Sequence, residues 1–413
     1  MSGTVLTFEQ ALSMVLEHAR DAAAQPSQRV EDVLLESAAG RVLAEAVMAD
    51  RDQPPFDRST RDGFAIRAAD AERTLRVVGL VRAGEAWSGA AVSEGEAVEI
   101  MTGAALPEGA DAVVMIEHVA VEGDSMRLND DRAGAVQAGM NIVPRGAEAR
   151  EGAGVLRAGT VLRAAEIAVA ASCGRVTLPV TAGAAVAIVS TGDELVEVEE
   201  MPGPLQIRNS NNYALAALVR GEGGEARTLP LARDTMEDVR EKIMAGREAE
   251  LLVLSGGVSM GKYDLVEAVL AELGAEFFFT GVWMQPGKPV VFGRVPRADG
   301  EWTYFFGLPG NPVSTQVTFA LFVAPLLRGL MGRREVGPRF MEARLSDDVK
   351  GGAKVTRFLP AEVTSAWDGV TVSVVGWHGS GDVAANARGN GYVVLPAGCE
   401  ELNAGNAVRV LLR

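Results

Sequence analysis

The 413-residue sequence is poor in the residues that several classes of protein require. It has two cysteines, Cys173 and Cys399, which lie far apart in apolar or glycine-rich surroundings. Neither a disulfide framework nor a cysteine-rich zinc site is therefore expected. It has only three histidines, and they form no ligand cluster and no Ser-His-Asp arrangement along the chain.

Positive charge and long apolar runs are scarce as well. The 39 lysines and arginines face 55 acidic residues, and the net charge of −16 argues against nucleic-acid or anionic-membrane partners. A few local cations can still hold a small anion. No apolar run approaches the ~18 residues that span a bilayer, and the N-terminus lacks the apolar core of a secretory signal. We therefore expect a cytoplasmic protein.

The length and the changing residue pattern predict several domains, because 413 residues exceed one ordinary core. An amphipathic helix is predicted over 7–24, where Thr7 and Gln10 have capping-box spacing and His18 is expected on the surface. The predicted regions are 1–50 with 145–180 as an N-terminal linker, a β-rich region 51–144, an α/β domain 181–328 and a C-terminal β-barrel 329–413.

Strands and helices alternate between 181 and 328, which predicts a mostly parallel sheet covered on both faces. The run "EFFFTGVWM", 276–284, is predicted to be one of its strands. Ligands bind at the carboxyl ends of the strands in such sheets. The loops "STGDEL" (190–195), "SGGVSMGKYD" (255–264) and "GLPGNP" (307–312) follow predicted strands, so we expect them to meet at this edge.

The glycine-rich loop 255–264 lies between a predicted strand and a predicted helix. Such a loop exposes backbone N–H groups, and the helix N-terminus favours an anion. Its serines add further donors. The spacing is not that of a Walker A loop. The alternative is an ordinary turn in which Asp264 only caps the helix.

Other loops carry acids and one well-placed lysine. Glu194, or its neighbour Asp193, could hold a metal or a hydroxyl, and the alternative is a polar turn. Asp62 lies in the charged loop "PPFDRSTRDGFA" (54–65), where turn chemistry is the alternative. Lys288 in "MQPGKP" suits a phosphate or an oxyanion. The alternative is an ordinary loop in which the prolines and the glycine only fix the backbone shape.

Six motifs occur in a fixed order: "PPFDRSTRDGFA", "IMTGAALPEGAD", "STGDEL", "SGGVSMGKYD", "MQPGKPVVFG" and "GLPGNPVS". Together they resemble the molybdopterin molybdenumtransferase family, which includes bacterial MoeA and the E domain of gephyrin. The resemblance runs from about Thr7 to the C-terminus. It implies a multidomain α/β plus β fold, with a three-layer α/β domain like that of MoaB and MogA, β-rich N-terminal regions and a C-terminal β-barrel.

The resemblance also implies a reaction. The family inserts molybdate into adenylylated molybdopterin, which releases AMP and forms the molybdenum cofactor, and a divalent metal such as Mg²⁺ is required. It implies a homodimer that forms through the N-terminal linker region and shares its active cleft between two chains. The adenylyltransferase of the same pathway is a candidate partner.

The resemblance assigns roles to particular residues. The motif acids fall on Asp62, Glu194, Asp234 and Asp264, of which Glu194 and Asp264 are the expected metal ligands. The expected substrate-binding residues are Thr102, Ser255, Gly256, Gly257, Ser259, Lys288, Pro309, Pro312, Arg357 and Ser380.

The sequence departs from the common family pattern at four positions. Arg58 and Arg61 replace an amide and a methionine, Gln285 replaces a frequent lysine, and Lys262 replaces a frequent acid. These changes leave the choice between molybdate and tungstate open. Two other functions stay open: a non-catalytic molybdopterin-binding scaffold and an adenylyltransferase-like enzyme. The extra regions argue against the second, because that activity needs only the α/β domain.

Overall fold

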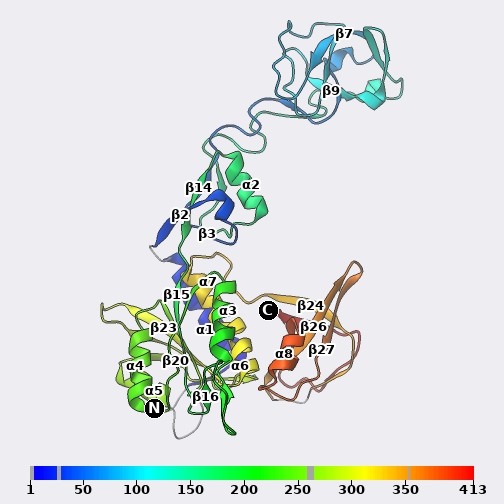
Figure 1. Cartoon of the computed structure of the whole chain (residues 1–413). Helices are drawn as coiled ribbons and strands as arrows, with labels where there is room; N and C mark the ends of the chain where they lie inside the picture. Colours follow the sequence, from blue (N-terminus) through cyan, green and yellow to red (C-terminus); the bar gives the residue numbers. More distant parts are fainter. Residues whose placement is uncertain (1–3, 26–28, 258–264, 352–353) are drawn as a thin grey trace. The chain divides into compact units, whose positions relative to one another are not determined.

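The computed structural model describes residues 4–25, 29–257, 265–351 and 354–413 (Figure 1). The chain forms two compact units. One comprises Met1–Ala44, Gly159–Leu162 and Leu178–Arg413, and the other comprises Glu45–Ala158 and Arg163–Thr177. The finer division into four regions stays a prediction.

Helix α1 (Phe8–Ala24) begins with the predicted capping box. The Thr7 hydroxyl accepts the N–H of Gln10, and the Gln10 side chain accepts the N–H of Thr7. The prediction for His18 is wrong, because its ring is half-buried and stacks on Phe278 with the ring centroids 4.3 Å apart. Burial lowers the pKa of His18, and the nearby acids oppose this only in part.

The α/β domain has a six-stranded sheet in the order β18-β15-β19-β23-β22-β20. Only β22 runs antiparallel to its neighbours, so the prediction of a mostly parallel sheet is confirmed. The strands are β15 (Ala185–Ser190), β18 (Glu225–Thr228), β19 (Leu251–Ser255), β20 (Glu276–Phe279), β22 (Val291–Pro296) and β23 (Trp302–Leu308).

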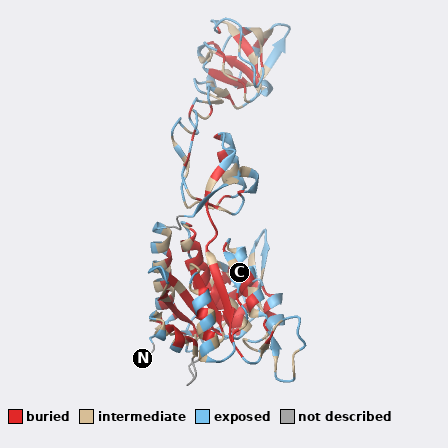
Figure 2. Cartoon of the chain, turned by 60° about the vertical axis from the view of Figure 1, so that its left-hand side comes forward, coloured by how far each residue is buried: buried red, intermediate tan, exposed pale blue. Residues whose placement is uncertain are grey.

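Helices cover both faces of this sheet, and β19 shows why. Leu251 and Val253 pack against one hydrophobic cluster, whereas Leu252 and Leu254 pack against another on the opposite face. Buried residues accordingly concentrate in the strands (Figure 2). The helices on the first face are α1, α3 (Asn211–Gly221), α6 (Pro312–Thr318) and α7 (Ala324–Leu330), and those on the second are α4 (Met236–Gly246) and α5 (Leu265–Glu272).

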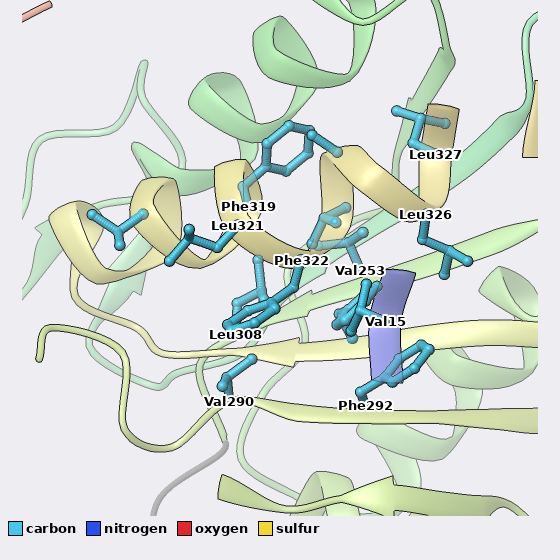
Figure 3. Packing of buried hydrophobic residues seen from close by; sticks show 14 of the residues in the cluster. Val15, Val253, Val290, Phe292, Leu308, Phe319, Leu321, Phe322, Leu326 and Leu327 are labelled. Atoms are coloured by element: carbon cyan, nitrogen blue, oxygen red, sulfur yellow. The ribbon is translucent and has the colours of Figure 1, made fainter. Parts of the chain in front are cut away.

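Helices α6 and α7 are joined through a π-helical segment, η5 (Phe319–Val323), into one helical run. Phe322 and Leu326 of this run pack against the sheet near Val253 and Leu308 (Figure 3). The run Pro312–Leu330 is long and apolar enough to cross a membrane, which corrects the expectation that no segment approaches that length. Because 83% of its apolar window is buried inside the protein, the run is the core helix of this domain.

The predicted strand 276–284 is two strands. The chain leaves the α/β sheet after β20, and β21 (Gly281–Gln285) pairs with β1 (Val5–Thr7) and with β26 instead. The segment therefore connects the α/β sheet to the C-terminal sheet.

The C-terminal region contains the predicted barrel. Its strands pair in the order β26-β27-β24-β30-β28, and β28 pairs again with β26, which closes the barrel. The elements are β24 (Phe340–Leu345), β26 (Thr356–Ala366), β27 (Gly369–Val374), β28 (Gly391–Leu395), β30 (Ala407–Leu412) and the short helix α8 (Val383–Arg388).

The other unit contains a six-stranded sheet in the order β10-β11-β7-β8-β6-β9, so the β-rich prediction for this part of the chain is confirmed. The strands are β6 (Gly63–Ile66), β7 (Thr74–Val81), β8 (Glu96–Ile100), β9 (Ala112–Met115), β10 (Val119–Glu122) and β11 (Ser125–Leu128). Helix α2 (Ala164–Ser172) also belongs to this unit.

Short strands complete both units. They are β2 (Val30–Leu34), β3 (Val42–Leu43), β4 (Val47–Met48), β5 (Arg58–Ser59), β12 (Ile142–Val143), β13 (Gly154–Leu156), β14 (Thr177–Thr181), β16 (Leu195–Val196), β17 (Ile207–Arg208), β25 (Val349–Lys350) and β29 (Glu401–Leu402).

Candidate active site

A cavity of about 920 Å³ lies at the carboxyl edge of the α/β sheet. The loops after β15, β19 and β23 all line it, so the predicted meeting of these loops is confirmed. Seven of the predicted site residues line this cavity: Glu194, Asp234, Ser255, Gly256, Gly257, Pro309 and Pro312. We call it the large cavity.

Two glycines bring the loop after β19 close to the loop after β15. Gly256 and Gly257 have φ values of 89° and 65°, which residues other than glycine rarely adopt. A Cβ on Gly257 would lie 2.6 Å from the Thr191 hydroxyl oxygen, and one on Gly256 would lie 2.5 Å from the Thr191 carbonyl oxygen. The glycines are therefore required for this close approach of the two loops.

The acids at the large cavity come from two neighbouring loops. The Asp234 carboxylate accepts the backbone N–H of Asp193, and the Asp193 carboxylate accepts that of Asp234, each at 3.3 Å. This exchange ties the loop after β15 to the loop after β18. The Glu194 carboxylate lies against Gly192 and also lines the cavity. Carboxylate oxygens of this kind suit a hard cation such as Mg²⁺.

Asn211, at the start of α3, connects two further loops. Its Nδ2 donates to the Ser255 hydroxyl oxygen and to the Gly310 carbonyl oxygen, both at 2.8 Å. The sequence reasoning missed this residue. The available signal was the run "NSNNY" at a predicted helix start, where polar side chains normally serve as caps.

A second cavity of about 440 Å³, the small cavity, shares Pro289, Pro309 and Asn311 with the large one. The predicted residues Lys288, Arg357 and Ser380 line it together with Gln285.

The two cations of the small cavity have different surroundings. The Nε of Arg357 is buried and has no hydrogen-bond partner in the part of the chain that the structure describes. The Lys288 ammonium lies over the Trp283 ring, 4.5 Å from its centroid, which is cation–π geometry. The sequence placed these residues in a site without indicating that they line a separate cavity.

Asp62 and Thr102 form a local pair in the other unit. The backbone N–H and the hydroxyl of Thr102 both donate to Oδ1 of Asp62, at 2.6 and 2.9 Å. These hydrogen bonds lower the pKa of Asp62, so its carboxylate is ionised at neutral pH. Arg58, one of the departures from the family pattern, pairs with Glu148 at 2.9 Å.

Three residues singled out by sequence, Ser259, Lys262 and Asp264, lie outside the described residues. Within the described part of the chain, no three His, Cys, Asp or Glu side chains cluster as a metal site would require. The predicted metal ligand pair therefore has one described member, Glu194.

Fold and cavities together define a multidomain protein whose α/β domain has a large ligand site with donors and acids, next to a smaller site with two cations. Family models cover most of the chain. Residues 6–174 match the MoeA N-terminal region (domain I and II), 187–329 a probable molybdopterin binding domain and 342–412 the MoeA C-terminal region (domain IV).

Known proteins resemble the chain over nearly its whole length. It is 34% identical over 396 residues to the molybdopterin molybdenumtransferase of Staphylococcus aureus (strain Mu50), which covers 94% of this chain and 92% of the relative. The enzyme of the same name from Staphylococcus epidermidis (strain ATCC 12228) is 33% identical over 389 residues, with 92% and 90% covered. A crystal structure of the molybdopterin biosynthesis MoeA protein from Pyrococcus horikoshii matches with a TM-score of 0.72, 31% identity and 99% coverage of both chains. The chain belongs to the molybdopterin molybdenumtransferase family.

Proposed function

We propose that this protein inserts molybdate into adenylylated molybdopterin, releasing AMP and forming the molybdenum cofactor. The observation that carries the proposal is the pair of adjoining cavities, of which the large one lies at the edge of the α/β sheet and the small one is lined by the α/β domain and the C-terminal region. The large cavity has the size and the polar lining for a nucleotide-bearing ligand. The small cavity, with Lys288 and Arg357, suits a tetrahedral oxyanion. The shared residues Pro289, Pro309 and Asn311 would bring the two ligands close together.

The acids of the large cavity fit the proposed Mg²⁺ requirement in their chemistry, since Glu194 and Asp234 offer hard oxygen ligands. Glu194 would hold the ion together with Asp264, which lies outside the described residues. A bound Mg²⁺ would neutralise charge on the phosphoryl oxygens. Lys288 and Arg357 would hold the oxyanion, and the glycine-rich edge of the sheet would receive the phosphate-bearing end of the pterin.

The direct test incubates the purified protein with adenylylated molybdopterin, Mg²⁺ and molybdate. Mass spectrometry should then find the metal-bearing pterin, and chromatography should find one AMP for each pterin converted. Omission of molybdate should abolish the metal-bearing product, and substitution of tungstate would measure the oxyanion preference. Adenylylated pterin made from molybdopterin and ATP would instead identify an adenylyltransferase, and binding without conversion would identify a scaffold.

The proposal includes a homodimer, as the family resemblance implies, and a location in the cytoplasm, as the sequence analysis predicts. Light scattering of the purified chain should give twice the monomer mass of 43.3 kDa. A fully active monomer would contradict the proposed dimer while leaving the proposed reaction intact. Copurification with the adenylyltransferase of the same pathway would support the proposed partner.

A further inference from the structure

The side-chain amide of Asn211 has only one orientation that satisfies both of its neighbours. A backbone carbonyl can only accept a hydrogen bond, so the atom that faces the Gly310 oxygen at 2.8 Å must be the NH₂ group. The same Nδ2 lies 2.8 Å from the Ser255 hydroxyl oxygen. Ser255 must therefore accept this hydrogen bond.

A hydroxyl that accepts a hydrogen bond keeps its own proton for another acceptor. Ser255 is the last residue of β19 and lines the large cavity, where its side chain is 1% exposed. No hydrogen bond donated by this hydroxyl occurs among the residues that the structure describes. Within the described part of the chain, the Ser255 proton is thus a buried donor at the cavity wall that lacks an acceptor.

Other polar groups near Ser255 show the same deficit of acceptors. The side-chain Nδ2 of Asn209 is buried and has no partner among residues 4–25, 29–257, 265–351 and 354–413, while its Oδ1 accepts the N–H of Asn212 at 3.3 Å. The Thr191 hydroxyl is also buried, and it too has no partner in those ranges. The 11-residue helix α3 starts here, and its N-cap residue Ser210 makes no side-chain cap. Donors and a helix N-terminus in one place favour an anion.

We infer that Asn211 is a positioning residue that holds the Ser255 hydroxyl as an obligatory donor to a phosphoryl oxygen of the ligand in the large cavity. The direction of the hydrogen bond follows from the geometry alone. The choice of a phosphoryl oxygen as the acceptor rests on the proposed function, because the substrate proposed there carries phosphate.

The test compares calorimetric binding of AMP with that of adenosine, which lacks the phosphate. In the wild-type protein AMP should bind more tightly than adenosine. Ser255→Ala should weaken AMP binding by about 10-fold or more, the scale for a hydrogen bond to a charged group, and should leave adenosine binding nearly unchanged. Asn211→Asp should have a similar effect, because a carboxylate would accept the Ser255 proton and reverse the hydrogen bond.

A double-mutant cycle separates this role from simple charge repulsion. If Asn211 acts through the Ser255 proton, Asn211→Asp should cause little further loss of AMP affinity in the Ser255→Ala background. Equal losses in both backgrounds would overturn the inference, since they would show that the new carboxylate acts directly on the phosphate. Melting temperatures of all variants check that the fold is kept.

A matched control removes a different buried hydroxyl. Thr318 is fully buried, donates to the Ser314 carbonyl oxygen at 2.8 Å, and does not itself line either cavity. Thr318→Val should lower stability and leave the preference for AMP over adenosine unchanged.

The inference and the proposed function can fail separately. Turnover of adenylylated molybdopterin together with equal binding of AMP and adenosine would overturn the inference alone. A preference for AMP that depends on Ser255, without any cofactor formation, would overturn the proposed function alone.

Discussion

The polar side chains at the two ends of the α/β sheet differ in how they are paired. At the carboxyl end, Asn209, Thr191 and Ser255 have donor groups around a cavity that find no acceptor among the described residues. At the other end, Glu222 follows α3 and forms a two-pronged ion pair with Arg328, at 2.6 and 2.8 Å. Arg333 donates to Glu222 as well, and Arg328 also donates to the Gly337 carbonyl oxygen at 2.6 Å.

The difference separates binding from stability. Unsatisfied buried groups cost free energy, so a fold retains them where a ligand can supply the missing partners. Glu222 and Arg328 are instead bonded to each other, and such a buried ion pair helps to hold its surroundings in one arrangement. The carboxyl end of the sheet, here called the open end, is therefore expected to control function. The opposite end, here called the closed end, is expected to control stability.

The largest effect is expected from a change that breaks the ion pair at the closed end. Glu222→Gln leaves Arg328, whose side chain is 7% exposed, without its counter-ion. The free energy of unfolding should fall by roughly 3 kcal/mol or more, the scale for an unpaired buried charge. Chemical denaturation measures this loss, and the activity of the remaining folded protein should be unchanged.

The control for that change is Glu225→Gln, which removes an exposed ion pair with Arg29 at 3.3 Å. Because both partners are more than half exposed, stability should change by less than about 1 kcal/mol. Equal losses in the two variants would show that the closed end has no special role.

The next effect concerns the open end. Glu194→Gln keeps the shape of the side chain and removes a charge from the large cavity. Turnover should fall by about 100-fold, the scale for one well-placed electrostatic contact, and the melting temperature should stay the same. Glu237→Gln, on the exposed first turn of α4, should change neither property. A loss of stability without a loss of turnover in Glu194→Gln would show that this end of the sheet controls stability and not function.

A smaller effect is expected at the small cavity. Lys288→Ala should weaken molybdate binding by about 10-fold, the loss of one charge-assisted contact, and the binding should also weaken with salt. Equilibrium dialysis measures it. Lys242→Ala, on α4 beside Asp238, should leave molybdate affinity unchanged. Identical affinities of the wild type and Lys288→Ala would exclude Lys288 from the oxyanion site.

The smallest effect is a pH dependence at the aromatic cluster around His18. Burial lowers the pKa of His18 in the folded protein, so the unfolded chain binds the proton more tightly. The stabilisation is complete above the unfolded pKa of about 6.5 and is lost progressively as the pH falls from there through the lower pKa of the folded state. The melting temperature should therefore fall between pH 7 and pH 5 more in the wild type than in His18→Phe. Parallel profiles would show that His18 makes no contribution.

Some elements were predictable because their causes are local. The capping box of α1 needs only residues 7 and 10. The hydrophobic periodicity of 181–328 predicts its alternation of strands and helices. The positions of Glu194, Ser255 and Pro309 at one edge followed from the same alternation, because parallel strands end on the same side of a sheet.

Other predictions were wrong because the features depend on residues that are distant in the chain. The helical pattern left His18 on the boundary of the buried face, and it is the rings of Phe278, Phe292 and Tyr304 that cover it. In the same way, 276–284 has one continuous β pattern, and only the pairing of β21 with β1 and β26 divides it between two sheets.

The sequence by itself determined the family, the order of strands and helices in the α/β domain and the loops that carry its polar groups, since each depends on residues near one another along the chain. The tertiary structure alone decided that Asn211 reaches Ser255 and Gly310, and that Lys288 and Arg357 line one cavity. These partners are separated by 44 to 99 residues in the first case, and no local pattern records which side chains such distant loops bring within hydrogen-bond distance.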